Sequence, residues 1–466
     1  MALSRIWSAF VIIAILVASV QLMRSGDHSR IYSKMVTGKA GDTTMTRVYD
    51  SVHVPAAMVQ QLAGKKEYKQ GEDRVQQLSD GSYMSYKEQN ADGILATCKS
   101  AVEICIGLIG IMALFMGFMR IAENAGGIRL LSKIIGPFFS RLFPEVPKGH
   151  PAMGHMMLNF SANLLGLDNA ATPFGIKAME SLQELNPDKS RATNAQIMFL
   201  CLHAAGLTLI PVSIIAMRAK LNASDPTDIF LPCMIATFVA TLAAMTIVAL
   251  RQKINLFQPV ILAWILGISA LIAGLIWYLS HLDKEHMEGF SATLSNGLIL
   301  LIFLAIVAGA LYKKINVFDA FVEGAKGGFE TSVKIIPYLV GMLVAISMLR
   351  TSGVFDMITG GMKYLFTALH FNTQIVDALP TAMIKPLSGS GARGMMVDTM
   401  KVFGADSFAG RLSCVFQGSS DTTFYVIAVY FGAVSVKNTR YAVGSMLLAD
   451  LIGILTAIII CSYWPW

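Results

Sequence analysis

Long apolar runs separated by short polar stretches make up most of the chain beyond residue 95. Several of them reach the roughly 20 residues that a helix needs to cross the hydrocarbon core of a bilayer. They lack the period of two that marks the strands of a membrane β-barrel. We therefore predict an all-α polytopic membrane protein. The clearest predicted spans are residues 101–119, 230–250, 258–280, 294–312 and 441–463.

The first 95 residues differ from the rest. The apolar run 6–23 follows Arg5 and fits either a cleaved signal peptide or an uncleaved anchor. It is longer than a typical signal-peptide core and no clean Ala-x-Ala site follows it, which favours an anchor. We predict an N-terminal transmembrane helix over residues 1–23. Residues 24–95 are polar with mixed charge and predict an extramembrane insertion.

The remaining chain repeats its own pattern. Residues 96–251 and 316–466 are predicted repeats, joined by two transmembrane helices in 252–315. Each repeat begins with an apolar helix that ends in an arginine, Arg120 or Arg350, and a glycine-bearing amphipathic segment follows. Polar breaks further along also match, because alignment of the repeats pairs Thr208 with Thr422.

Basic residues predict the orientation of the repeats. Loops rich in Lys and Arg stay in the cytoplasm. Four loops are basic here, whereas the loops near 225–228 and 281–288 have no positive excess. Placing all four inside gives the repeats opposite orientations, an arrangement common in secondary transporters. The basic loops contain Arg120 to Lys148, Arg251 and Lys253, Lys313 and Lys314, and Lys437 and Arg440.

This topology requires two segments that enter and leave the membrane on the same face. Residues 152–184 are broken by a Gly/Pro-bearing stretch at 166–173, and residues 376–403 by one at 386–394. We predict a re-entrant helical hairpin for each segment. Unwound backbone at membrane depth must line a cavity or lie within protein, because lipid cannot satisfy its polar groups.

Each repeat also contains an interrupted helix. Residues 194–217 are broken near 203–208, and residues 408–431 at 417–423. Half-helix ends present free N–H or C=O groups and a dipole end. We expect the two hairpin tips and the two breaks to converge at mid-membrane, where they could hold a polar or anionic solute and a small cation.

The candidate site residues come from these four regions. Asp421 is the sharpest candidate, since a carboxylate at mid-membrane needs a proton, a cation or a partner; the alternative is a helix cap. His203 is either a ligand or proton carrier or a hydrogen-bonded core residue. Asp168 and Arg393 could bind solute, pair or cap helices. The candidates for solute binding are Asn163, Asp168, Asn169, Thr172, Ser388, Ser390, Arg393, Gln417, Ser419, Ser420 and Thr422, and those for ion coupling are Asp421, His203, Thr208 and Thr423.

Composition narrows the function. The chain is 54% hydrophobic and 14% charged, and its net charge of +7 comes from loops that set topology, so we expect no nucleic-acid partner. Six scattered cysteines lack metal-site spacing. No sequence motif of a hydrolase or metalloprotease is present, so we expect no enzyme, no cofactor and no metal. Coupling to Na⁺ or H⁺ is compatible with the candidate site.

Several of these motifs resemble a known family. The stretches FPEVPKGHP (143–151) and NLLGLDNAATPFGIKAM (163–179) resemble spore maturation protein A. The stretches IIPYLV (335–340), PLSGSG (386–391) and QGSSDTTFYVIAVYFG (417–432) resemble spore maturation protein B. The chain thus resembles the two proteins fused, with 96–251 as the A-like and 316–466 as the B-like gate repeat. His203 to Gly206 depart from the run of Asn, Thr and Ser usual in protein A.

The resemblance implies a nucleoside recognition or gate domain, which the family shares distantly with concentrative nucleoside transporters. It implies hairpins paired with broken helices and a place in the bacterial inner membrane as a multi-pass protein. We expect a transporter-like protein that moves a small solute by alternating access; a homodimer is compatible with this. The alternative is a non-transporting scaffold that supports assembly of the cell envelope or cell wall.

Overall fold

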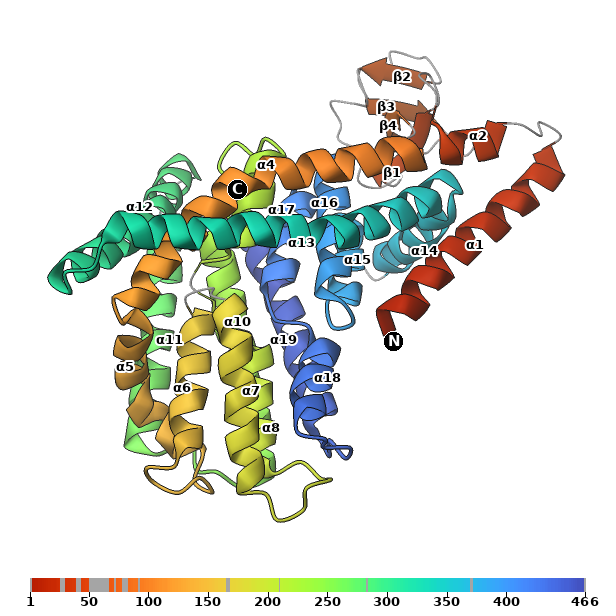
Figure 1. Cartoon of the computed structure of the whole chain (residues 1–466). Helices are drawn as coiled ribbons and strands as arrows, with labels where there is room; N and C mark the ends of the chain where they lie inside the picture. The colour runs from red at the N-terminus through yellow and green to blue at the C-terminus, as the bar shows by residue number, and fades with distance from the viewer. Residues whose placement is uncertain are drawn as a thin grey trace. The chain divides into compact units, whose positions relative to one another are not determined.

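The computed structural model describes residues 2–25, 30–38, 43–49, 67–70, 73–77, 83–90, 93–164, 168–208, 210–281, 284–368 and 372–464. These residues are nearly all helical (Figure 1). The chain divides into two compact units, each described on its own below. Unit 1 comprises Met1–Gly107, Val333–Ile384 and Ser390–Ser413; unit 2 comprises Leu108–Ser332, Lys385–Gly389 and Cys414–Trp466.

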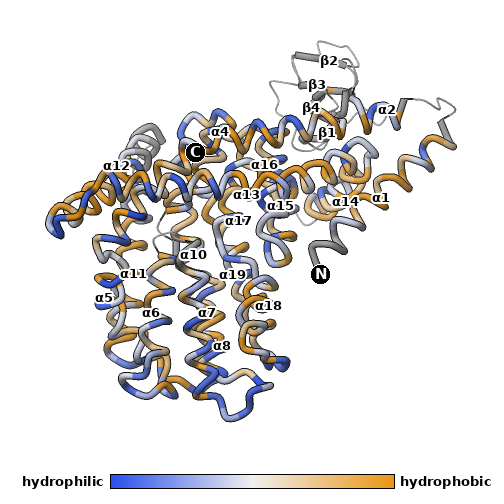
Figure 2. Tube along the Cα trace, viewed as in Figure 1, coloured by the Kyte–Doolittle hydropathy of each residue, from blue (hydrophilic) through white to orange (hydrophobic). Residues whose placement is uncertain are grey.

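Among the described residues, four helices are long and apolar enough to cross a membrane. They are α4 (Ile94–Asn124), α10 (Phe230–Gln252), α13 (Val317–Thr351) and α19 (Ala442–Tyr463). Shorter apolar segments lie in α1 (Ala2–Ser25), α11 (Pro259–Ser280) and α12 (Lys284–Tyr312). Figure 2 shows hydrophobic residues along these helices and hydrophilic ones in the loops. The chain is therefore a multi-pass membrane protein.

The helices form two series in the same order. The first is α4, α5 (Gly127–Leu142), α6 (Pro151–Leu164), α7 (Asp168–Glu184), α8 (Asn194–Ala204), α9 (Val212–Lys220) and α10. The second is α13, α14 (Val354–Ala368), α15 (Gln374–Ile384), α16 (Gly389–Phe403), α17 (Phe408–Gly418), α18 (Thr423–Ala433) and α19. A glycine with positive φ follows the first helix of each series, Gly126 at 81° and Gly353 at 72°. Glycine adopts this left-handed conformation at little cost, so it ends helices.

The helix breaks lie close to their predicted positions. Helices α8 and α9 are separated at 205–211, and α17 and α18 at 419–422. The hairpin breaks are shorter than predicted. Helix α16 already begins at Gly389, so most of 386–394 is helical, and Pro173 lies inside α7. A glycine-rich stretch lowers helix propensity without forbidding a helix.

The prediction of an all-α protein is incomplete, because part of the polar insertion forms a β-sheet. In unit 1, β1 (Thr43–Tyr49), β2 (Glu67–Gln70), β3 (Asp73–Gln77) and β4 (Tyr83–Asn90) pair in the order β1-β4-β3-β2, all antiparallel. The strands contain Thr, Val and Tyr, which favour pleated backbone. A search for long apolar runs does not detect such short polar strands.

Unit 1 anchors the first helix. Trp7 Nε1–H donates to Gly341 O of α13 at 2.8 Å, and Gln21 donates to Ser352 O at 3.0 Å. The segment that resembles a signal anchor therefore packs on the C-terminal part of α13. Within the same unit, Lys363 and Asp377 form a buried ion pair at 2.8 Å.

Close helix packing in unit 2 relies on glycine. A methyl group on Gly328 of α13 would lie 2.6 Å from the backbone nitrogen of Ala113 of α4. Small residues let apolar helices approach this closely in membranes. Elsewhere in the unit, α6 packs along α7 and α10 packs along α19. The largest core cluster, with Phe199 and Tyr430, joins helices of both series.

Polar bonds join four loops of unit 2. The Lys437 N–H donates to Ser190 O at 2.9 Å, which connects the loop after α18 with the loop after α7. The Asn194 amide donates to Glu145 at 2.7 Å and accepts from Arg440 at 2.9 Å. At the end of α10, Gln252 donates to Asn194 O at 2.8 Å. The ends of three predicted basic loops therefore meet around Asn194.

Candidate solute site at two helix breaks

The first break begins where α8 ends. Thr193 and Gln196 form a capping box that fixes the start of α8. Eleven residues later the helix stops at Ala204, before Gly206 and Pro211. The carbonyl of Ala205 then accepts a hydrogen bond from the Thr241 hydroxyl of α10 at 2.7 Å. One carbonyl exposed by the break is thus satisfied from a neighbouring helix.

His203 points into the protein in the last turn of α8 and is 4% exposed. Its Nδ1 lies 2.9 Å from Asn159 Oδ1 and 2.8 Å from Asn163 Nδ2, both in α6. The Tyr430 ring meets the imidazole edge to face at 4.8 Å. The imidazole is therefore held by the first hairpin and by α18.

Two side-chain amides of α6 face His203 Nδ1 and act on its tautomer in opposite ways. Asn159 Nδ2–H donates to Ala171 O at 2.7 Å, which turns Asn159 Oδ1 toward the imidazole. Asn159 Oδ1 only accepts and Asn163 Nδ2 only donates, so the two amides favour opposite protonation states of His203 Nδ1. Nε2 faces Asp421 Oδ2 at 3.8 Å. In the neutral ring with its proton on Nδ1, Nε2 and the carboxylate are two acceptors with room for a proton or a small cation between them.

Gly175 of α7 has no side chain, which leaves room for Tyr430 and Asn159 beside His203. A methyl group on Gly175 of α7 would lie 2.5 Å from the Tyr430 ring and 2.8 Å from Asn159 Nδ2. Tyr430 also makes side-chain hydrogen bonds with Thr172 and Asn159. Helix α7 therefore approaches α18 closely enough to bring Thr172 into the site through Tyr430.

The second break contacts the first directly. The Asp421 N–H donates to the carbonyl of Ala204 at 2.7 Å. The Asp421 carboxylate accepts from the Thr422 N–H at 2.6 Å, and its side chain is 50% exposed. The N-cap residue of α18 is Thr422, with no side-chain capping bond. Asp421 thus lies one residue before the position that a helix cap would occupy.

The tip of the second hairpin packs on the second break. Phe424 N–H donates to Pro386 O at 3.0 Å, and Gln417 Nε2–H donates to Gly389 O at 3.4 Å. A methyl group on Gly389 would lie 2.6 Å from the Thr422 hydroxyl. The chain between α15 and α16 therefore comes close to the polar residues that interrupt α17 and α18.

Asp450 of α19 binds the other side of this break. Its Oδ2 accepts a hydrogen bond from the Thr423 hydroxyl at 2.6 Å, and Ser420 donates to it as well. Lys385 of the hairpin tip interacts with it electrostatically. Thr423, Ser420 and Asp450 therefore form a buried network that connects α18 to α19.

The structure places most of the predicted residues in unit 2. Asn163, His203 and Asp421 meet, whereas Thr423 bonds to Asp450 instead of Asp421. Thr208 bonds only locally among the contacts described, to Gly206 O at 3.4 Å. Ser388, Gln417, Ser419, Ser420 and Thr422 all lie at or beside the second break.

Two of the predicted residues belong to the other unit, and two more begin α7. Ser390 and Arg393 belong to unit 1, where Arg393 lies near Cys105. Asp168 and Asn169 begin α7, but their side chains lie outside the described part of the chain. Within the described residues, no group of three or more His, Cys, Asp or Glu side chains could hold a metal ion.

Two contributors were missed at the sequence level. Asn159 precedes Asn163 by four residues, which puts both amides on one face of a helix. That spacing was a usable signal. Tyr430 stands in an apolar helix, where an aromatic residue usually only packs. Nothing in the sequence near it indicates a contact with His203.

Comparison with known proteins identifies similar chains. The family model Gate, described as nucleoside recognition, matches residues 105–221 and 332–437. Spore maturation protein B of Bacillus subtilis (strain 168) is 48% identical over 169 residues, which are 36% of this chain and 93% of that protein. Spore maturation protein A of the same organism is 40% identical over 156 residues, which are 34% of this chain and 80% of that protein. No solved structure matches.

Proposed function

This chain belongs to the family of spore maturation proteins A and B, and we propose that it moves a small polar or anionic solute across the membrane by alternating access. The observation that carries the proposal is the direct bond between the two breaks, from Asp421 N–H to Ala204 O at 2.7 Å. Unwound backbone within membrane-spanning helices is tolerated where it is buried in protein or lines a cavity. Transporters bind solutes and ions at such half-helix ends.

The two helix series support a further part of the proposal, that they are inverted repeats with re-entrant hairpins. Helices α6 and α7 pack along each other as a hairpin. The loops that meet around Asn194 include ends of three basic loops, which the positive-inside rule assigns to one face. We place the protein in the bacterial inner membrane, without enzymatic activity and compatible with a homodimer.

Ion coupling is proposed at His203 and Asp421. In the tautomer with its proton on Nδ1, His203 Nε2 and the Asp421 carboxylate face each other as acceptors at 3.8 Å, and a proton or Na⁺ between them would remove their repulsion. The cation would also satisfy the carboxylate, whose charge is costly within a membrane. The solute would then bind beside it, at the polar groups of the second break and the hairpin tips.

The test of coupling uses Asp421→Asn in the purified full-length protein. Thermal unfolding is measured from pH 5 to 8 and from 0 to 100 mM Na⁺. Wild type should gain thermal stability with Na⁺ or with protons, and Asp421→Asn should lose that dependence while it still folds. An unchanged dependence in the variant would exclude Asp421 as the coupling residue.

Asp188→Asn is the matched control, an Asp-to-Asn change in the loop after α7. Hydrogen bonds from Ser190 lower the pKa of Asp188 below its usual value near 4. A depressed pKa stabilises the folded state only above that range, and the effect is lost as the pH falls through it. Asp188→Asn should therefore leave the pH 5–8 and Na⁺ responses of wild type intact.

Transport itself is tested in proteoliposomes with two probes, labelled uridine as a polar solute and labelled inorganic phosphate as an anion. Uridine follows from the nucleoside recognition description of the matched domain. Uptake of one probe driven by a Na⁺ or pH gradient, and lost in Asp421→Asn, is the expected result. If wild type takes up neither probe and its stability responds to neither cation, the transport proposal fails and the scaffold role remains.

The inverted arrangement is tested by single-cysteine labelling in a chain whose six native cysteines are replaced. Cysteines at Lys253 and His281 should label from opposite faces of the membrane, because α11 spans between them. A cysteine at Lys313 should label with Lys253. Labelling of positions 253 and 281 from the same face would contradict the inverted repeats.

A further inference from the structure

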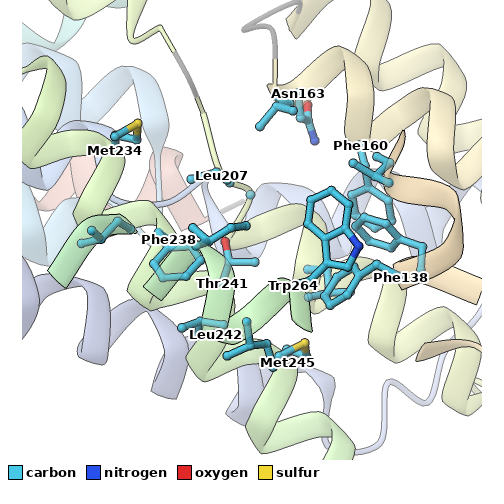
Figure 3. A pocket seen from close by; sticks show the side chains of 18 of the residues that line it. Phe138, Phe160, Asn163, Leu207, Met234, Phe238, Thr241, Leu242, Met245 and Trp264 are labelled. Atoms are coloured by element: carbon cyan, nitrogen blue, oxygen red, sulfur yellow. The ribbon is translucent and has the colours of Figure 1, made fainter. Parts of the chain in front are cut away.

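A cavity of about 330 Å³ lies in unit 2 beside the first break (Figure 3). Helices α5, α6, α10 and α11 surround it, together with the chain at Gly206 and Leu207. Its size falls at the lower end of the roughly 300–1,000 Å³ of small-molecule sites. The cavity is separate from the contact between His203 Nε2 and Asp421, although Asn163 borders both.

The lining of this cavity is almost entirely hydrocarbon. Among the described residues that line it, none is ionisable, and the side chains with a polar atom are Asn163, Thr241 and the indole of Trp264. Aromatic rings of Phe138, Phe160 and Trp264 form part of the wall. An apolar cavity of this kind does not hold water stably and instead takes up apolar ligands.

The cavity has a polar end and an apolar end. In Figure 3, Asn163 lies at one edge of the group of lining residues, and Leu242 and Met245 lie at the opposite edge. The backbone of Gly206 and Leu207 also lines the cavity, so one part of the wall offers amide groups of the break. A ligand that fills the cavity can therefore place an uncharged polar group at this edge and an apolar remainder at the other.

The rim indicates where such a ligand comes from. Leu271 lines the cavity and is 67% exposed on α11, a helix with a 17-residue apolar segment, Pro259–Leu275. In a membrane the surroundings of this rim are lipid hydrocarbon. The ligand is thus an amphiphile dissolved in the membrane.

We propose that the cavity binds the alkyl chain of a single-chain amphiphile with an uncharged hydroxyl or carbonyl head. The head lies at Asn163 and the first break, and the chain extends past Trp264 toward Met245. The volume suits one chain better than the two chains of a phospholipid. This site goes beyond the proposed solute and cation site and does not depend on it.

The test uses tryptophan fluorescence of the full-length protein in detergent. One variant keeps only Trp264, and the matched control keeps only Trp277, which lies on the same helix but does not line the cavity. The probe is 12-bromododecan-1-ol, because bromine quenches tryptophan on contact. Quenching of Trp264 should saturate with probe concentration. Trp277 should show only the linear quenching that partition into the micelle produces.

Two further probes test the chemistry of the ligand. The matched carboxylate, 12-bromododecanoate, should bind at least ten-fold more weakly, since the described residues that line the cavity include no cationic side chain. A phospholipid with brominated chains should quench Trp264 no more than Trp277. Equal or tighter binding of the carboxylate would overturn the uncharged head, and saturable quenching by the phospholipid alone would overturn the single chain.

A cavity-filling variant completes the test. Ile268→Phe adds volume to a lining residue and should weaken the alcohol at least ten-fold. Ala270 lies two residues further along the same helix, is exposed and does not line the cavity. Ala270→Phe should therefore leave binding of the alcohol unchanged. Linear quenching of Trp264 in the protein without either change, equal to that of Trp277, would refute the site.

Discussion

The two helix breaks occupy the same place in the two helix series, but they obtain their polar groups from different sources. The first break is formed by small and apolar residues after His203, and its partners come from Asn159 and Asn163 of the hairpin and Thr241 of α10. The second break is formed by Ser, Asp and Thr residues of its own, which bond within the break and to Asp450.

A second contrast concerns the arginine near the C-terminal end of the first helix of each series. Arg120 forms partly exposed ion pairs with Glu123 and Glu323. Arg350 forms a bidentate pair with Asp398, and both side chains are nearly buried. At these positions the first series relies on partners from neighbouring helices and on partly exposed ion pairs, whereas the second relies on enclosed bonds of its own. Four pairs of variants test this difference.

The largest expected effect concerns the arginines. Arg350→Met leaves the Asp398 carboxylate in a nearly closed site without its partner at 2.5 Å, and breaking a buried pair costs about 3–5 kcal/mol. Arg120→Met removes partly exposed pairs, each worth about 0.2–1 kcal/mol. Chemical unfolding in detergent measures both. If both variants lose the same free energy of unfolding, the two arginines do not differ in how they stabilise the protein.

Asp450 gives the next largest effect. Asp450→Leu leaves the buried Thr423 hydroxyl and the Ser420 hydroxyl without their acceptor, at about 1–3 kcal/mol for each group. Asp450→Asn keeps an acceptor oxygen, so its free energy of unfolding should fall clearly less than that of Asp450→Leu. The free energy of unfolding distinguishes the two variants. If both lose the same amount, the carboxylate charge matters more than the hydrogen bonds.

Gly175 tests the packing of the first series. Gly175→Ala puts a methyl group 2.5 Å from the Tyr430 ring, and overpacking costs about 1–3 kcal/mol. Gly154→Ala is the control, because a methyl group there has no neighbour within 4 Å. In a helix that change should be neutral or stabilise by up to about 1 kcal/mol. Similar unfolding midpoints for the two variants would contradict tight packing at Tyr430.

The helix breaks could be predicted because their cause is local. Gly206 and Pro211 end one helix, and the run from Gln417 to Thr423 interrupts another. The glycine and proline residues also led to a predicted break in the second hairpin that is too long, since Gly389 to Gly394 are helical. Glycine permits a break without requiring one. At Gly394 the absence of a side chain lets α16 pass close to Met342, where an added methyl group would lie 2.8 Å from the Met342 side chain.

Partners across the fold could not be predicted from local signals. Asp421 was identified from its position in an apolar region, but its bond to Ala204 joins residues 217 positions apart. Asn159 and Tyr430 enter the site only because α6 and α18 approach His203. The sheet in the insertion was missed for a different reason, since its strands are short and polar.

The smallest expected effect compares one hydroxyl at each break. The Thr241 hydroxyl lies 2.7 Å from Ala205 O, a carbonyl just past the end of α8 that the break has freed, and 2.7 Å from Thr237 O of its own helix. Thr241→Val keeps the shape and removes the donor, so it should cost about 0.5–1.5 kcal/mol.

The matched change at the second break is Ser419→Ala. The Ser419 hydroxyl bonds only to Phe416 O among the contacts described, three residues earlier at 2.9 Å. Such local side-chain bonds compete with the backbone's own pairing and add little to helix stability. We therefore expect a loss near zero for Ser419→Ala and a measurable loss for Thr241→Val in the same unfolding experiment. A larger loss for Ser419→Ala would mean that the second break also needs single hydroxyl bonds to keep its shape. The first break would then no longer be the one that relies on neighbouring helices for its polar contacts.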